Sequence, residues 1–465
     1  SAALFTANHE SNDGSIAIGR SALTTKNLAS GSQFDGATIA IGHQALTALT
    51  SGIENTVVGY NAGLAATTES QSTLIGYQAG YQLLDSSDNT FVGFQAGAQI
   101  GSHLAISNTF IGSLAGANGE SDAPNDNVAI GNVAVGYKAM GDRQADGEAE
   151  FDTTYSVAIG EQALSHATSG AANVAIGYLT NQNMTAGEGN VAIGASAGQH
   201  MTTCEDNVVI GREAGMKLAH EDSDKNTAVG RTALGGGHNT YAGNTAKENT
   251  AVGYHAVGGG TGSTTDLTAT NNVGVGYDCL QAISTGTHNI AIGSSAADSL
   301  TTANKTIFIG TGSGQTVTTT GGSNVSDGTV GIGYNALYAL TSGAGNVAIG
   351  YQALLEHTAQ DDNTVLGYQA AFNTNDSHCA QNVFIGKLSG GGSWGGTARY
   401  NTAVGFESMI GALNGSEHNT MIGYRAGDGL TSGQYNTGIG SGVTFDIDAN
   451  NQTALGYGAT TDSAN

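Results

Sequence analysis

The residues of this sequence best suited to chemistry are its carboxylates, which lie in irregular polar segments. Asp361 with Asp362, and Glu221 with Asp222 and Asp224, are the groups from which the paired acids of a polysaccharide-cleaving enzyme would come. Such an enzyme needs two carboxyl groups about 5 to 9.5 Å apart beside a cleft. The same oxygen atoms suit Ca²⁺, but the sequence has no EF-hand loop or calcium-binding nonapeptide. Because the acids occupy turn-like segments at positions that do not recur, solvated turn residues are the favoured interpretation.

Other catalytic and ligand-binding motifs are missing from the sequence. No GxSxG, HExxH or phosphate-binding loop motif occurs. The glycine-rich stretches 258–265 and 310–323 are not followed by Lys, so we expect loops there. Cys204, Cys279 and Cys379 are far apart with no CxxC pair, which argues against a zinc site or a disulfide framework. Cys279 stands where other copies have Ala and is expected to be a small buried residue. The sequence therefore predicts no enzymatic activity, no cofactor and no metal.

The composition is typical of a repetitive folded protein. Gly accounts for 73 of the 465 residues, there is a single Pro, and charged residues make up 11%, whereas an average globular protein has about 25%. The formal net charge of −25 argues against a nucleic-acid partner, which needs a basic stripe. No apolar run of about 18 residues occurs, so no membrane insertion is expected. The chain opens on Ser1 and shows no signal peptide, so we expect a leader or a longer N-terminal region to be missing.

One short motif recurs along the whole chain and must position every other residue. It reads NTVVGYNAG at 55–63 and STLIGYQAG at 72–80, and its Gly recurs most often every 17 residues, with longer intervals such as 19, 23 and 24. Ile, Val or Leu precedes the Gly, and Thr or Val stands three before it. Since side chains alternate along a strand, these two positions share one face, which we predict to be the interior. A small residue three after the Gly is expected to form the second wall of a narrow core.

Asn and Gly mark the predicted corners of the repeat. Asn, four before the Gly, tolerates a left-handed backbone, and its side chain can satisfy turn amides or stack on the Asn of the next copy. The motif Gly is expected where a positive φ or a close backbone approach excludes a β-carbon. The structural positions predicted on this basis are Asn55, Gly59, Asn89, Gly93, Asn173, Gly177, Asn190, Gly194, Asn346, Gly350, Asn401 and Gly405.

A strand, a corner, a second short strand and a polar gap fit into 17 residues if the chain winds as a solenoid. The gaps lack the apolar residue every three or four positions that an amphipathic helix needs, so helix content should be close to nil. We predict an all-β parallel β-solenoid (β-roll) of roughly 25 coils stacked about 4.8 Å apart, forming one continuous shaft over 1–465. Longer loops that break the period are expected near 141–155, 258–271, 310–329 and 388–400.

Aromatic residues recur directly after the motif Gly, as at Tyr60, Tyr77 and Phe94. They predict a vertical stack of rings, formed either between coils alone or at a subunit interface, where aromatic residues are enriched. Trp394, the single Trp, lies in a glycine-rich insertion between coils. It is the candidate contact for a receptor or a glycan, and a local cap over the coil edge is the favoured alternative.

The copies NVAIGYQAL at 346–354, NVAIGASAG at 190–198 and SVAIGEQAL at 156–164 resemble the head repeats of trimeric autotransporter adhesins. Similar repeats occur in phage tail-fibre proteins, and the resemblance covers nearly the whole chain. It implies a left-handed parallel β-roll and the association of three chains about a common axis. The chain departs from that family in its longer repeat of mostly 17 residues, and no heptad stalk, neck or membrane anchor is recognised in it.

Together these features predict a fibre protein, extracellular or on the virion surface. The expected function is that of a shaft, in a virion tail fibre or a bacterial surface adhesin, which mediates attachment to a host cell or surface. The expected partners are two further copies in a homotrimer and a cell-surface receptor or glycan. The alternatives are a self-assembling extracellular filament without a receptor role and a polysaccharide-degrading tail spike.

Overall fold

The computed structural model describes residues 14–25, 37–100, 104–117, 128–141, 152–216, 218–235, 244–258, 267–317, 326–374, 379–394 and 396–461. The chain divides into two compact units, Ser1–Lys225 and Asn226–Asn465. Strands and turns make up the described residues, which contain no helix. Each unit is a parallel β-solenoid, so the predicted fold class is confirmed. Left-handedness and one continuous shaft over 1–465 stay predictions.

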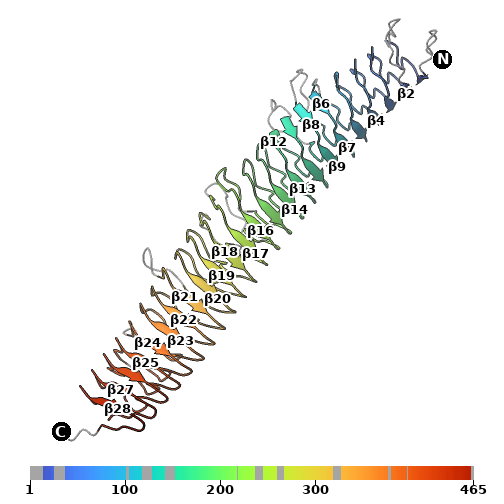
Figure 1. Ribbon diagram of the computed structural model, residues 1–465. Coiled ribbons are helices and arrows are strands. Elements are labelled where there is room, and N and C mark those ends of the chain that lie inside the picture. The colour runs from blue at the N-terminus through green and yellow to red at the C-terminus, as the bar shows by residue number, and fades with distance from the viewer. Residues whose placement is uncertain are drawn as a thin grey trace. The chain divides into compact units, whose positions relative to one another are not determined.

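The first unit is built on a parallel sheet of motif strands. These strands are β1 (Ile16–Ile18), β2 (Ile39–Ile41), β3 (Thr56–Val58), β4 (Thr73–Ile75), β5 (Thr90–Val92), β7 (Thr109–Ile111), β9 (Val133–Val135), β11 (Val157–Ile159), β13 (Val174–Ile176), β14 (Val191–Ile193) and β15 (Val208–Ile210). Each strand pairs with its copy in the next coil (Figure 1), so that Val57 of β3 lies opposite Leu74 of β4. One repeat therefore contributes one strand to this sheet.

The first unit also has a second, smaller parallel sheet. It consists of β6 (Leu104–Ile106), β8 (Val128–Ile130), β10 (Asp152–Thr154) and β12 (Ser169–Ala171). β8 belongs to a segment, NVAIGNVAVGYKA, that carries the motif twice in its sequence. Gly131, after β8, has a φ of 66°, whereas Gly136, after β9, has the φ of 134° that is usual for a motif Gly. Only the second half of this segment is therefore a motif strand.

The second unit repeats the same ladder. Its strands are β16 (Thr227–Val229), β17 (Thr250–Val252), β18 (Val273–Val275), β19 (Ile290–Ile292), β20 (Ile307–Ile309), β21 (Val330–Ile332), β22 (Val347–Ile349), β23 (Thr364–Leu366), β24 (Val383–Ile385), β25 (Thr402–Val404), β26 (Thr420–Ile422), β27 (Thr437–Ile439) and β28 (Thr453–Leu455). Ala348 of β22 lies opposite Val365 of β23. Equivalent residues of successive repeats are therefore neighbours throughout this unit.

The middle residue of each motif strand faces the core, and its two neighbours face outward. In β22, Ala348 is fully buried, whereas Val347 and Ile349 are only half-buried. The prediction that the residues one and three before the Gly point inward is therefore wrong. The core instead takes the middle residue of the strand, and its second wall includes the small residue three after the Gly, such as Ala353, which is fully buried as predicted.

The loops predicted to break the period fall mostly outside the described residues. The central parts of the loops near 141–155, 258–271 and 310–329 are not described, whereas 388–400 is described except for residue 395. Within the described ranges, no helix has the length and apolar character needed to cross a bilayer.

Candidate functional site

A ladder of buried Asn side chains runs along each unit at the start of the motif strands. Asn363 Oδ1 accepts hydrogen bonds from the backbone N–H and from Nδ2 of Asn382, both at 3.1 Å. Asn363 Nδ2 donates to Asn346 Oδ1 at 3.2 Å and to the Cys379 carbonyl at 3.0 Å. Unpaired buried polar groups are destabilising. Each ladder Asn therefore stabilises the corners by supplying hydrogen-bond partners to polar groups of its own coil and of the adjacent coils.

The predicted Asn positions all belong to this ladder. In each case the side-chain oxygen accepts the backbone N–H of the residue at the same position in the next coil; the six residues are Asn55, Asn89, Asn173, Asn190, Asn346 and Asn401. The prediction that Asn itself takes the left-handed conformation is wrong. The left-handed residue is the one before it, as at Asp362, where φ is 60°.

The motif glycines form a second column, in which backbone lies directly on backbone. Gly350 has a φ of 143°, and a β-carbon built on it would lie 2.2 Å from the carbonyl oxygen of Gly367 in the next coil. The same close approach, between 2.0 and 2.8 Å, holds at the other predicted positions, Gly59, Gly93, Gly177, Gly194 and Gly405. Positive φ and close approach both exclude a side chain, as predicted.

The acids Asp361 and Asp224 have a structural role at the corner six residues before the motif Gly. Asp361 Oδ1 accepts the backbone N–H of Ala344, its equivalent in the preceding coil, at 2.8 Å. Asp224 Oδ1 accepts that of Glu205 at 2.9 Å. In other coils the side chain at this position also accepts the backbone N–H of its equivalent in the preceding coil. These acceptors are Ser70, Asn304, Asp327 and Asn450. Sequence reasoning missed this role, although the recurrence of Asp, Asn and Ser at one position signalled it.

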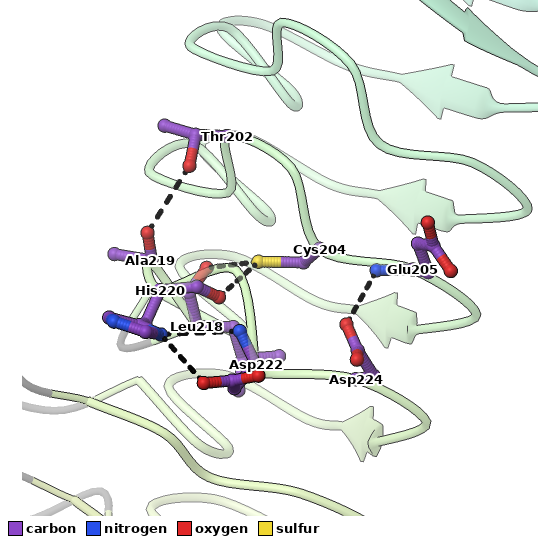
Figure 2. Close-up of polar contacts among 8 residues, drawn as sticks. All are labelled: Thr202, Cys204, Glu205, Leu218, Ala219, His220, Asp222 and Asp224. Atoms are coloured by element: carbon purple, nitrogen blue, oxygen red, sulfur yellow. Dashed lines mark hydrogen bonds and ion pairs between the residues drawn. The ribbon is translucent and has the colours of Figure 1, made fainter.

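Figure 2 shows two of the acids at 221–224, Asp222 and Asp224, together with the buried Cys204. Asp222 turns toward His220, whose Nδ1 lies 3.5 Å from Asp222 Oδ2, whereas Asp224 turns toward the backbone of Glu205. Glu221 is exposed. The structure therefore gives Asp222 and Asp224 different partners.

The cysteines are buried and have no disulfide partner. Cys204 Sγ donates to the carbonyl oxygen of His220 at 3.1 Å. Burial raises the pKa of Cys204 to about 11 and that of Cys279 to about 12. Both thiols therefore stay protonated at neutral pH, which is typical of a structural rather than a reactive Cys. The prediction that Cys279 is a small buried residue is confirmed.

The aromatic residues after the motif Gly form ring columns on the outside of the coils. Tyr60 and Tyr77 stack with ring centroids 5.5 Å apart, and Tyr77 and Phe94 stack at 5.2 Å. In the second unit Tyr351 and Tyr368 stack at 5.0 Å. These five rings remain between 42% and 49% exposed. The predicted vertical stacking between coils is confirmed, and the rings keep an open edge.

The ring columns are part of an exposed apolar surface on each motif sheet. We call this surface, formed by the residues three before, one before and one after each motif Gly, the outer face. Its large aliphatic members with about two fifths of their surface exposed include Ile75, Ile111, Ile159, Ile292, Leu366, Ile422 and Ile439. Contiguous apolar surfaces of this kind mark interaction sites in soluble proteins.

Trp394 is not exposed. The side chain is 2% exposed, packs edge-on against Phe384 with ring centroids 5.1 Å apart, and donates its indole N–H to the Gly390 carbonyl at 3.0 Å. The structure therefore places Trp394 in the core, and its assignment as a candidate surface contact is wrong.

One carboxyl group in the first unit is buried in the coil. At Ser72 a Ser takes the place of the ladder Asn, and the Glu69 side chain lies beside it, fully buried. The Ser72 hydroxyl donates to Glu69 Oε1, and the Ser86 backbone N–H donates to Glu69 Oε2 at 3.1 Å. Loss of hydration on burial, only partly offset by these bonds, raises the pKa of Glu69 from its ordinary value of 4.5 to about 7.

The raised pKa of Glu69 predicts a coil that is less stable at alkaline pH. The folded state binds this proton more tightly than the unfolded chain, so stability falls as pH rises from about 4.5 to about 7 and stays at the lower level above that. Glu69→Gln should remove this dependence and raise the free energy of unfolding at pH 8 by on the order of 3 kcal/mol. Urea unfolding at several pH values tests this, with the exposed Glu161→Gln as control. An unchanged pH profile in Glu69→Gln would contradict the assignment.

Within the part of the chain that the structure describes, no group of three or more His, Cys, Asp and Glu side chains is placed to hold a metal ion. The repeat aligns the ladder Asn residues, the motif glycines and the aromatic rings from coil to coil, and it leaves the outer face exposed. No protein-family model matches this chain, and no curated protein matches it.

Proposed function

We propose that this chain is the shaft of an extracellular or virion-surface fibre, that three copies associate through the outer face, and that the fibre mediates attachment to a host cell or surface. The observation that carries the proposal is the exposed apolar outer face. Ladder Asn, motif Gly and buried Ala are all used to stack one coil on the next. The outer-face Ile and Leu residues are instead left in solvent by a single chain.

A second copy of the chain is the partner that suits this face best. An apolar strip that follows the coils is matched along its length by a surface with the same repeat, and burial of aliphatic and aromatic side chains stabilises such interfaces. The number of three copies rests on the resemblance to the trimeric adhesin heads. The stacked rings would then serve both the single coil and the interface.

Polar substitutions on the outer face should separate the copies without unfolding them. Ile349→Asp combined with Leu366→Lys places opposite charges on neighbouring coils of the outer face, where they would have to be buried between copies. We expect light scattering to give three times the chain mass of 46.4 kDa for the wild type and the single-chain mass for the variant, with the same far-ultraviolet dichroism.

The matched control carries the same charges on another corner of the coils. Ser342→Lys with Ala359→Asp should keep the wild-type mass. If the wild-type protein is monomeric at micromolar concentration, the proposed association is contradicted, whereas the solenoid fold is not. Particles that grow without limit would instead favour the self-assembling filament.

Attachment is tested with the virus or the cell that carries this protein. Deleting the chain should abolish most of the adsorption of the virion, or adhesion of the cell, to its target, and added purified protein should compete with the intact particle. Unchanged adsorption after the deletion would contradict the proposed function. Release of sugar fragments from a polysaccharide, stopped by Asp361→Asn or Asp222→Asn, would point instead to the degrading spike.

A further inference from the structure

One corner of the second unit carries three aromatic side chains that the coil itself does not require. Tyr400, His418 and Tyr435 occupy the same position in successive coils, directly before the ladder Asn of β25, β26 and β27, and we call them the ring corner. The ring centroids are 4.6 Å apart for Tyr400 and His418 and 4.8 Å apart for His418 and Tyr435, with interplanar angles of 17° and 4°. Tyr400 is 47% and Tyr435 54% exposed. The stack therefore presents ring edges to solvent.

The backbone of the ring corner is unfavourable for these residues. Tyr400, His418 and Tyr435 have φ values of 59° or 60°. Such left-handed residues are most often Gly, Asn or Asp, because a bulky side chain is strained there. At the same position Asp362 and Asn451 fit that preference, whereas Gln381, in the coil next to Tyr400, has a φ of 61° without fitting it. The left-handed backbone is therefore a general feature of this corner, and what sets these three coils apart is the stack of aromatic side chains.

The surroundings of the ring corner are polar and balanced in charge. Gln381 and Asn451 hold the equivalent positions in the coils on either side of the column, and both are exposed. The adjacent column contains Arg399, which lies in register with Glu417, followed by Gln434. One cation, one anion and several amides therefore border the rings. This balance contrasts with the net charge of −25 of the whole chain.

We propose that the ring corner binds an uncharged polysaccharide that lies along the stacking direction of the coils. Apolar C–H groups of pyranose rings pack against aromatic side chains, and sugar hydroxyl groups pair with amides and with charged side chains. The coils repeat about every 4.8 Å, a distance comparable to one pyranose unit of an extended chain, so successive sugars meet successive rings. The inference rests on the proposed attachment function and names the class of ligand that the fibre recognises.

The double variant Tyr400→Asn/Tyr435→Asn tests the ring corner without disturbing the coil. Asn removes both phenol rings and accepts the left-handed backbone, so unfolding should be unchanged. The matched control is Tyr155→Asn, because Tyr155 is also left-handed with a φ of 52° and 66% exposed, but lies in the first unit, outside the column. The full chain is passed over immobilised dextran, mannan and galactan, with alginate as an anionic polymer.

We expect at least one of the three neutral polymers to retain the wild-type chain and the Tyr155→Asn control, while alginate does not. Retention should weaken about tenfold or more in the double variant, as for loss of aromatic anchors at other binding sites. Failure of every neutral polymer to retain the wild type, or equal retention of the double variant, overturns the inference. A chain that binds a neutral polymer through the ring corner, but whose deletion leaves attachment unchanged, contradicts the proposed function alone.

Discussion

Gly350→Ala is expected to lower the free energy of unfolding of the second unit by on the order of 3 kcal/mol. The φ of 143° strains any residue with a β-carbon, and this carbon would lie 2.2 Å from the carbonyl oxygen of Gly367. The two coils must move apart to make room, which weakens the bond from the Gly367 N–H to the Ile349 carbonyl, now 2.8 Å. Urea unfolding followed by far-ultraviolet dichroism measures the global loss. The fluorescence of Trp394, the single Trp, reports the coils nearby.

Gly442→Ala is the control that separates strain from collision. Gly442 has a φ of 66°, but a β-carbon there would meet no atom within 4 Å. Strain alone should reduce stability by about 1 kcal/mol. If Gly350→Ala and Gly442→Ala are equally mild, the close backbone stacking of the motif glycines is wrong.

Asn363→Ala should be comparably damaging, with a loss on the order of 2 to 5 kcal/mol. The substitution leaves the buried N–H of Asn382 and the carbonyl of Cys379 without the side chain that they contact at 3.1 and 3.0 Å. Unsatisfied buried polar groups are expensive because they lose water and gain no partner. Equilibrium unfolding in urea measures the effect.

Asn363→Ser provides a graded comparison, because the ladder already contains Ser. In the first unit, Ser72 Oγ accepts the backbone N–H of Asn89 at 3.1 Å. Asn363→Ser should therefore recover part of the stability lost in Asn363→Ala. Identical losses for the Ser and Ala variants would mean that the ladder hydrogen bonds contribute little.

The features that the sequence predicted are those that depend on the period. A recurrence of mostly 17 residues leaves one motif strand per repeat and equivalent residues side by side, as Ala348 and Val365 are. Gly at a fixed position indicated a backbone contact that no side chain tolerates. Asn at a fixed position indicated a side chain that hydrogen-bonds from coil to coil. Such inferences depend on residue type alone and need no knowledge of which face is inside.

The features that the sequence did not predict depend on which way each side chain points, into the core or toward solvent. Alternation along a strand separates Ala348 from Val347 and Ile349 but does not say which set is buried, because all three are apolar. The prediction from the sequence places Val347 and Ile349 in the core, whereas β22 buries Ala348 and leaves Ile349 on the outer face. Trp394 is a related case, since a glycine-rich composition indicates a loop but does not say whether a large side chain within it is buried.

The central claim is that each repeat is one coil, stacked in register on the next, and an engineered disulfide tests it most directly. Gln369 Nε2 donates to Gln352 Oε1 at 2.8 Å, so the two side chains leave adjacent coils side by side. Coils about 4.8 Å apart meet the Cα separation that a disulfide needs, about 4.4 to 6.8 Å. Under mild oxidation, Gln352→Cys/Gln369→Cys should form an intrachain disulfide in nearly every molecule, measured by mass after thiol labelling. The pair Gln352→Cys/Asp361→Cys, which joins two positions that are not equivalent in the repeat, should form little. Equal disulfide yields for the two pairs would contradict the stacking of one coil per repeat.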